Sequence, residues 1–208
     1  NVVAISTDKA VKPVSAMGMT KALQEKIILS DDLTKDKTKF CCVRYGNVLG
    51  CRGSVIPLWN SKIEQNEPLP VTHPDMTRFL LTLSQAIDLV FYSLKYGKGG
   101  EIFVKKAPSA TMVNLAKAYA ELKTGKKDYP LKYVGIRAGE KIDEVLVSHE
   151  EMRRAHEKKD HFVIERESNF DVTSLKKSLK TIEYDSGSVS HLSVKELKEI
   201  MKKLNWIL

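Results

Sequence analysis

Cysteine is scarce in this sequence and follows no recognised spacing. The three cysteines are Cys41, Cys42 and Cys51, and no two of them form a Cys-x-x-Cys pair. A zinc ribbon or a dithiol redox motif needs such a pair, so both classes are excluded. The five histidines show no ligand-like spacing either. We therefore expect no metal site, and we interpret the thiols as buried or half-buried packing residues in a reducing compartment.

Long apolar runs and an N-terminal signal pattern are also lacking. No stretch approaches the roughly eighteen apolar residues of a membrane-spanning helix. The first residues lack the basic, apolar and small-residue order of a signal peptide. The hydrophobic content of 42% and charged content of 29% are typical of a chain that buries a core. The sequence predicts a cytoplasmic protein with no membrane span.

Positive charge is in excess, since 34 basic residues against 26 acidic ones give a net charge of +8. The lysines are dispersed along the sequence, and no aromatic stripe is interleaved with them. A nucleic-acid-binding module would be expected to concentrate basic and aromatic residues on one surface. We therefore expect no nucleic-acid partner, and we interpret the charge as solvated surface plus a site for a diphosphate.

Chemistry-bearing residues gather near the N-terminus. The apolar run Val2–Ile5 predicts a buried parallel strand, and it ends in Ser6-Thr7-Asp8-Lys9. Residues 16–30 carry apolar residues among good helix formers, which predicts a helix. Met17 and Lys21 are four apart and therefore share a face of this helix. Because ligands of open α/β sheets bind at the carboxyl ends of the strands, we expect a site here.

Strand and helix patterns alternate along the rest of the sequence, which predicts the α/β class without internal repeats. The predicted elements are strands at 40–44, 101–104 and 131–134, and helices that begin at Ser54, Ser84 and Met112. Candidate capping boxes pair Ser148 with Glu151 and Ser193 with Glu196. The lysine-rich stretch 150–159 is the nearest approach to a hinge.

The ordered motifs of the first 150 residues resemble a known superfamily. They are Ser6-Thr7-Asp8-Lys9-Ala10-Val11, Met17-Gly18-x-Thr20-Lys21, Arg44-Tyr45-Gly46-Asn47-Val48-Leu49-Gly50, Arg52-Gly53-Ser54-Val55-Ile56-Pro57, Met76-Thr77-Arg78-Phe79 and Arg137-Ala138-Gly139-Glu140-Lys141. This series is similar to the extended short-chain dehydrogenase/reductases, and within them to UDP-N-acetylglucosamine 4,6-dehydratases of surface-polysaccharide synthesis. Most of that superfamily has Tyr-x-x-x-Lys where this sequence has Met-x-x-x-Lys, as does a subset of these dehydratases.

The resemblance implies a hydride-transfer cycle with bound NADP or NAD. In that cycle C4 of the sugar is oxidised, C5 is deprotonated, water leaves from C6, and the hydride returns to C6. Asp8 stands at the family's acid position and Lys9 at its base position. Met17 carries no transferable proton, so we expect Lys21 to hold the nicotinamide ribose and the C4 proton to leave through Thr7, a water or the Asp8-Lys9 pair. Packing in a core is the alternative interpretation of Met17.

The same resemblance implies further contacts to the cofactor and to the substrate. Together with Lys21, the cofactor-binding positions are Ser6 and Arg44. The substrate-binding positions are Asn47 for the sugar nucleotide, Ser54 and Val55 for a phosphate at a helix N-terminus, Arg78 for the diphosphate, Arg137, and Glu140 for the ribose hydroxyls.

The family's Gly-rich turn is absent, because the eleven glycines form neither Gly-x-Gly-x-x-Gly nor Gly-x-x-Gly-x-x-Gly. We expect the C-terminal part of a Rossmann-like parallel sheet with helices, interleaved with substrate-lobe segments over 1–147, and a further substrate-lobe segment at 148–208. A UDP-sugar is the expected ligand, and a homo-oligomer is expected. The alternatives are a 4-epimerase or reductase of the same superfamily, and a truncated UDP-sugar-binding lobe without activity.

Overall fold

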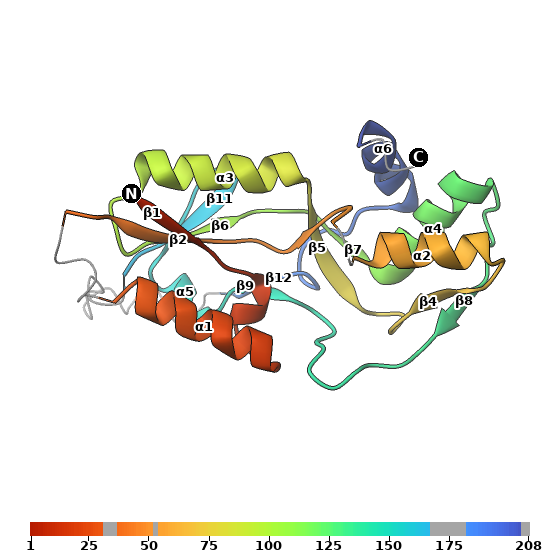
Figure 1. Ribbon diagram of the computed structural model, residues 1–208, viewed down its shortest axis with the longest axis horizontal. Coiled ribbons are helices and arrows are strands. Elements are labelled where there is room, and N and C mark those ends of the chain that lie inside the picture. The colour runs from red at the N-terminus through yellow and green to blue at the C-terminus, as the bar shows by residue number, and fades with distance from the viewer. Residues whose placement is uncertain (31–36, 52–53, 167–181, 205–208) are drawn as a thin grey trace. The chain divides into compact units, whose positions relative to one another are not determined.

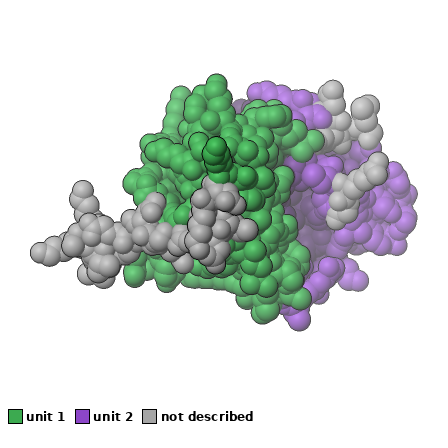
Figure 2. All heavy atoms as spheres, turned by 60° about the vertical axis from the view of Figure 1, so that its left-hand side comes forward, with its two compact units in different colours: residues 1–46, 81–107, 144–185 green, residues 47–80, 108–143, 186–208 purple. Residues whose placement is uncertain are grey.

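The computed structural model describes residues 1–30, 37–51, 54–166 and 182–204. This part of the chain divides into two compact units, coloured separately in Figure 2. Unit 1 consists of residues 1–46, 81–107 and 144–185, and unit 2 of residues 47–80, 108–143 and 186–208. Each unit is therefore assembled from three separate segments of the sequence.

Unit 1 is built on a five-stranded sheet with the order β1-β2-β6-β11-β10. Its strands are β1 (Val2–Ile5), β2 (Phe40–Arg44), β6 (Ile102–Lys105), β11 (His161–Ile164) and β10 (Ala155–Glu157). Strands β1, β2 and β6 are parallel to one another. Strand β11 pairs antiparallel with β6, and β10 pairs antiparallel with β11. The predicted strands at 2–5, 40–44 and 101–104 are confirmed, and so is the α/β class.

Helices cover both faces of this sheet (Figure 1): α1 (Ala16–Ile28) and the short α5 (His149–Met152) lie on one face, and α3 (Leu83–Tyr96) on the other. Cys41, Val43, Leu89 and Phe103 form a buried cluster between α3 and the sheet. A small second sheet pairs β9 (Val145–Val147) with β12 (Tyr184–Asp185). Two residues separate the carboxyl end of β1 from a 3-10 turn, η1 (Asp8–Ala10).

Unit 2 packs three helices against short strands. Its helices are α2 (Val55–Glu64), α4 (Met112–Thr124) and α6 (Val194–Lys203), and its strands are β3 (Asn47–Val48), β5 (Thr77–Leu81), β7 (Ser109–Thr111), β4 (Leu69–Val71) and β8 (Leu131–Tyr133). Trp59, Leu69, Tyr119 and Leu197 belong to its core. The capping box predicted at Ser193 is present at the start of α6.

Four expectations need correction. Residues 150–159 are no hinge, because they form most of α5 and then β10, which is paired into the sheet. Residues 148–208 do not form one substrate-lobe segment, because β11 pairs with β6 of unit 1 while α6 belongs to unit 2. Helix α3 begins one residue earlier than predicted, since Thr82 forms its capping box. The thiols of Cys41 and Cys42 are buried as expected, whereas Cys51 is exposed.

Candidate functional site

The predicted acid and base lie at the end of β1. Thr7 begins η1 as its N-cap, and its hydroxyl donates to Asp8 Oδ1 at 2.6 Å. Lys9 Nζ donates to Asp8 Oδ1 at 3.0 Å and to Oδ2 at 3.2 Å. Asp8 is 1% exposed, whereas the Lys9 side chain is 34% exposed. The structure thus brings together a buried carboxylate, a hydroxyl and an accessible amine, which are groups able to hold and move protons.

A second buried carboxylate, which the sequence analysis missed, completes this cluster. Glu144 Oε1 lies 3.7 Å from Lys9 Nζ, and Glu144 is 2% exposed. Glu144 follows the motif at 137–141 and is therefore far from Lys9 in the sequence. For this reason the spacing of residues around Lys9 did not predict the ion pair. An acidic residue directly before the apolar run of β9 was the available signal, because a charged side chain beside a buried strand needs a partner.

Helix α1 carries the Met-x-x-x-Lys pair against η1. Ser15 caps the helix by accepting from the Gly18 amide at 3.2 Å. A Cβ at Gly18 would meet the Lys9 carbonyl oxygen, so glycine is what permits the helix to approach η1 so closely. Met17 is 47% exposed, which excludes the alternative of a core-packed methionine in this structure. It is available at the surface and contributes no proton.

Lys21 is held at the same end of β1. Its Nζ donates to the Ile5 carbonyl at 3.0 Å and to Gln24 Oε1 at 2.9 Å. An ammonium has three donors, and these two bonds orient it while leaving the third for a ligand hydroxyl. Lys21 therefore fits the expected role at a cofactor ribose. The 208 residues contain no Gly-x-Gly-x-x-Gly string that would bind a pyrophosphate.

Ser6 and Arg44, the other two expected cofactor contacts, have a structural role instead. The Ser6 hydroxyl donates to the Glu25 carboxylate. Arg44 is 1% exposed and makes five hydrogen bonds, to both oxygens of Glu25, both oxygens of Glu151 and the Leu146 carbonyl. A guanidinium has five N–H groups, so none is left for a cofactor.

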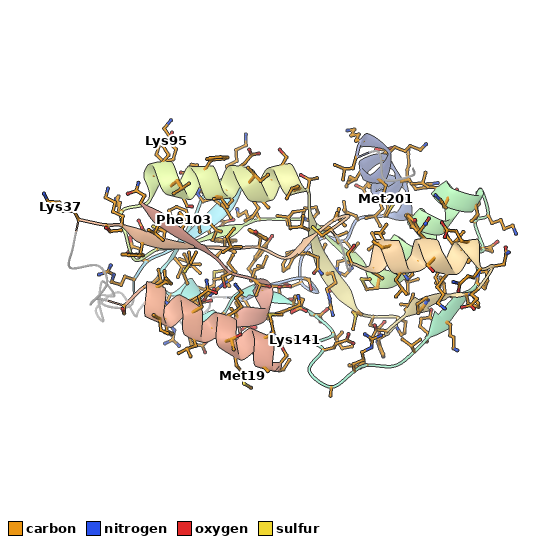
Figure 3. All side chains as sticks on the ribbon, in the orientation of Figure 1. Met19, Lys37, Lys95, Phe103, Lys141 and Met201 are labelled. Carbon is orange, nitrogen blue, oxygen red and sulfur yellow. The ribbon has the colours of Figure 1, made fainter. Side chains whose placement is uncertain are left out.

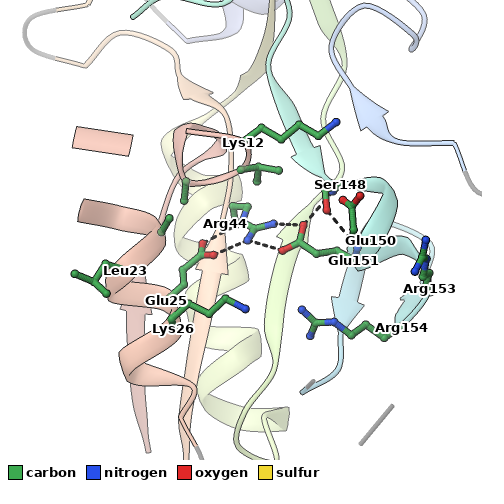
Figure 4. A pocket seen from close by; sticks show the side chains of 13 residues that line it. Lys12, Leu23, Glu25, Lys26, Arg44, Ser148, Glu150, Glu151, Arg153 and Arg154 are labelled. Carbon is green, nitrogen blue, oxygen red and sulfur yellow. Dashed lines mark hydrogen bonds and ion pairs between the residues drawn. The ribbon is translucent and has the colours of Figure 1, made fainter. Parts of the chain in front are cut away.

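Figure 4 shows how this network joins α1, β2 and α5 at the base of a 750 Å³ cavity in unit 1. Glu25 comes from α1, Arg44 ends β2 and Glu151 belongs to α5. Burial alone would raise the pKa of Glu151, but Arg44 outweighs it and the pKa lies below the ordinary glutamate value. The network therefore fixes the elements around η1.

The six predicted substrate-binding residues meet in one cavity of unit 2. This cavity has a volume of about 370 Å³, and Asn47, Ser54, Val55, Arg78, Arg137 and Glu140 all line it. Its apolar wall includes Met112, Leu115 and Val134. The sequence predicted the members of this group, and the fold places them around a common space of the size that small ligands occupy.

The N-terminus of α2 faces this cavity with groups that suit an anion. Ser54 is the N-cap but makes no side-chain cap bond, and its buried Oγ has no hydrogen-bond partner among the described residues. Val55 follows as the first helical residue. The first amides of a helix lack internal partners and attract negative charge. The unpaired hydroxyl and these amides together provide donors for phosphate oxygens.

Arg78 and Glu140 are set by local backbone contacts. Nη1 of Arg78 donates to the Thr77 and Ile142 carbonyls and Nη2 to the Lys141 carbonyl, at 2.6, 3.0 and 3.0 Å. Glu140 Oε2 accepts from the Arg137 amide at 3.2 Å. The loop that carries Arg137 and Glu140 is thereby held to β5. These bonds orient both side chains at the edge of the cavity.

Comparison with protein families matches residues 1–166 to a family described as "Polysaccharide biosynthesis protein". This chain belongs to that family. Its members are extended short-chain dehydrogenase/reductases, so the expected superfamily is confirmed. We also expected the narrower subset of dehydratases, but the similar curated proteins are not named dehydratases.

Curated relatives carry the name UDP-glucose 4-epimerase. The protein from Rickettsia bellii (strain OSU 85-389) is 41% identical over 214 residues, which cover 99% of this chain and 62% of the relative. The protein from Rickettsia prowazekii (strain Madrid E) is 40% identical with the same coverage. The chain thus spans less than two thirds of the length of these relatives.

Solved structures agree on the fold. Pen from Bacillus thuringiensis superposes with a TM-score of 0.87 at 33% identity, covering 99% of this chain and 62% of that one. A dTDP-glucose 4,6-dehydratase from Bacillus anthracis, solved with NAD, reaches a TM-score of 0.58 at 15% identity, covering 98% and 62%. The second likeness supports the fold alone.

None of the helices in the described ranges combines the length and the apolar character of a membrane span. Over the same part of the chain, no three acidic, histidine or cysteine side chains are grouped as metal ligands would be.

Proposed function

We propose that the protein containing this chain is an NAD(P)-dependent enzyme that oxidises the C4 hydroxyl of a UDP-sugar and then reduces the sugar again. The observation that carries the proposal is the cavity of unit 2, where six residues of the predicted substrate set converge. The names of relatives about 40% identical support a UDP-sugar as substrate.

Unit 2 would bind the nucleotide portion. The amides at the start of α2 and the Ser54 hydroxyl would receive phosphate oxygens, since a helix N-terminus favours anions. Arg137 and Arg78 would contribute positive charge to the diphosphate. Glu140, whose carboxylate already accepts one amide, would accept ribose hydroxyls through its remaining lone pairs. Asn47 would contact the sugar.

Unit 1 would carry the proton chemistry. Bound NAD or NADP would supply the acceptor and donor of hydride. Lys21 would hold the ribose of this cofactor. Because Met17 has no proton to exchange, the C4 hydroxyl would lose its proton to the group formed by Thr7, Asp8 and Lys9, directly or through water.

The fate of the C4 ketone distinguishes two reactions. Return of hydride to the opposite face of C4 gives 4-epimerisation, which the names of the relatives favour. Dehydration of UDP-N-acetylglucosamine is the second candidate, and the Asp8–Lys9 pair favours it. In that reaction Lys9 takes the C5 proton, and Asp8 gives its proton to the C6 hydroxyl, which leaves as water. The hydride taken from C4 returns to C6, and Lys9 then gives a proton back to C5.

Mass spectrometry in deuterated water separates these outcomes. The complete gene product is incubated with UDP-glucose and with UDP-N-acetylglucosamine. A product of unchanged mass that co-elutes with the 4-epimer and carries no solvent deuterium indicates epimerisation. Loss of water, with one deuterium at C5, indicates dehydration. If neither sugar is altered and UDP also fails to bind, the proposal is wrong.

A further inference from the structure

The Asp8–Lys9 pair is part of a three-membered charged group. Lys9 Nζ lies 3.0 Å from Asp8 Oδ1 and 3.7 Å from Glu144 Oε1. The side chains of Asp8 and Glu144 are 1% and 3% exposed, whereas that of Lys9 is 34% exposed. An accessible amine is therefore flanked by two carboxylates that are almost wholly removed from water.

Glu144 stands on a rigid support. It directly precedes β9, whose three residues are all buried, and β9 packs against η1. The Leu146 carbonyl of the same strand accepts from Arg44 Nη1 at 2.9 Å. The backbone that carries Glu144 is therefore anchored to the Arg44 network. A carboxylate supported in this way can fix the position of a flexible lysine.

A second carboxylate, Glu144, would matter because the charge on Asp8 changes during the proposed reaction. A buried carboxylate is costly unless a cation compensates for it. When Asp8 holds a proton during the reaction, its attraction for the Lys9 amine is lost. Once Lys9 has taken a proton from the sugar, Glu144 would attract the resulting ammonium in place of Asp8. With Asp8 alone, the lysine would be free to swing towards solvent in one half of the cycle.

We propose that Glu144 is a positioning residue that keeps the Lys9 amine in one place through both protonation states of Asp8. This inference rests on the proposed function, because it assumes that Asp8 and Lys9 carry protons. It assigns a role to a residue that the motif around Asp8 and Lys9 does not contain. Glu144 acts through Lys9 and need not touch the substrate.

The first test compares Glu144→Gln with Glu101→Gln in the complete gene product. Both remove a carboxylate from unit 1, but only Glu144 contacts Lys9. Glu101 stands before β6, at the other end of the parallel strands, where it accepts from the Lys98 and Gly99 amides. We expect Glu144→Gln to lower kcat by about 10- to 100-fold with little change in KM, because a small displacement of a catalytic group has effects of this order. The Glu144→Asp variant should recover part of kcat and shift the pH profile. Glu101→Gln should retain the wild-type kcat and pH profile.

The second test measures the amine itself and needs no turnover. Lys9 is acetylated briefly at fixed pH, and its labelling rate is read by mass spectrometry with Lys62 as internal reference. We expect labelling of Lys9 to become at least threefold faster in Glu144→Gln and to remain unchanged in Glu101→Gln, since only the first variant removes an anion beside the amine.

The two tests separate the inference from the function on which it rests. If the wild-type protein alters no UDP-sugar, the proposed function fails, and labelling alone decides whether Glu144 restrains Lys9. A folded Glu144→Gln variant with wild-type kcat and pH profile overturns the inference, whatever its labelling rate. Unchanged labelling overturns it as well. If Glu144→Gln does not fold, the same readouts are taken on Glu144→Asp.

Discussion

Under the proposed function Lys9 transfers protons and Met17 does not, because a thioether has no proton to transfer. We predict that Lys9→Met lowers kcat of the complete gene product at least about 100-fold, since loss of a general acid or base has effects of this size. Met17→Tyr should leave kcat within about threefold, because the proposed function assigns proton transfer to the group of Thr7, Asp8 and Lys9. Steady-state kinetics on the UDP-sugar provide the measurement. A severalfold rise of kcat in Met17→Tyr with the same product would contradict this assignment.

Arg44 is the residue on which the interior of unit 1 depends most. We predict that Arg44→Met lowers the free energy of unfolding by about 3–5 kcal/mol, because Glu25 and Glu151 would remain buried without a cation. Urea denaturation measures the difference. Lys62→Met, which breaks the more exposed Lys62–Glu67 pair, is the matched control and should change stability by less than about 1 kcal/mol.

The pH dependence of stability follows from the same network. The pKa of Glu151 is lowered in the folded protein, because Arg44 outweighs the opposing effect of burial. A group with a lowered folded pKa stabilises the protein above its unfolded pKa, and this contribution is lost as the pH falls through the folded value. Stability should therefore fall below about pH 4.5, the ordinary value for this residue. Glu151→Gln should flatten that part of the stability curve.

Whole elements differ in how far local sequence determines them. Helices α1, α4 and α6 could be predicted because their apolar spacing and caps are local. The short strands of unit 2, such as β3 and β7, could not, because two or three residues carry no period of their own and pairing partners lie far away. The cavity residues were found through motifs, whereas Glu144 and the ion pairs of Arg44 depend on contacts between distant segments.

The contact between α1 and η1 gives a prediction that reverses the usual effect of glycine in a helix. In an exposed helix, Gly→Ala stabilises by about 1 kcal/mol. At Gly18 a Cβ would instead meet the Lys9 carbonyl and Pro13 Cβ. We therefore predict that Gly18→Ala destabilises by about 1–3 kcal/mol, as overpacking does, and that it lowers kcat by moving Lys9. Thermal unfolding checks this, with the exposed Thr20→Ala as control. A rise in stability would contradict the packing argument.

Across the whole molecule, the three thiols should differ sharply in reactivity. Burial raises the pKa of Cys41 to about 11 and that of Cys42 to about 12. Cys51 is exposed. Because the thiolate is the reactive form, we predict that one thiol reacts quickly with a disulfide reagent in the native chain, and that the other two react only in denaturant. Fast reaction of all three would show that the sheet of unit 1 opens readily.

The outer surface of α1 carries a stripe of exposed apolar side chains. Met19, Leu23 and Ile27 are each more than half exposed and recur every four residues, and Figure 3 shows Met19 projecting away from the sheet. Such a stripe is suited to contact with another apolar surface. The homo-oligomer expected from the sequence stays a prediction.

The division of each unit into three segments also constrains how the molecule can be made. Unit 1 requires residues from its first strand to β12, and unit 2 requires α6 near the end of the sequence. Domains built from one continuous segment can fold one after another as they leave the ribosome. Here unit 1 is incomplete until β12 has been synthesised, and unit 2 until α6 has been synthesised. We therefore expect each unit to expose apolar surface during synthesis until its last segment has been made.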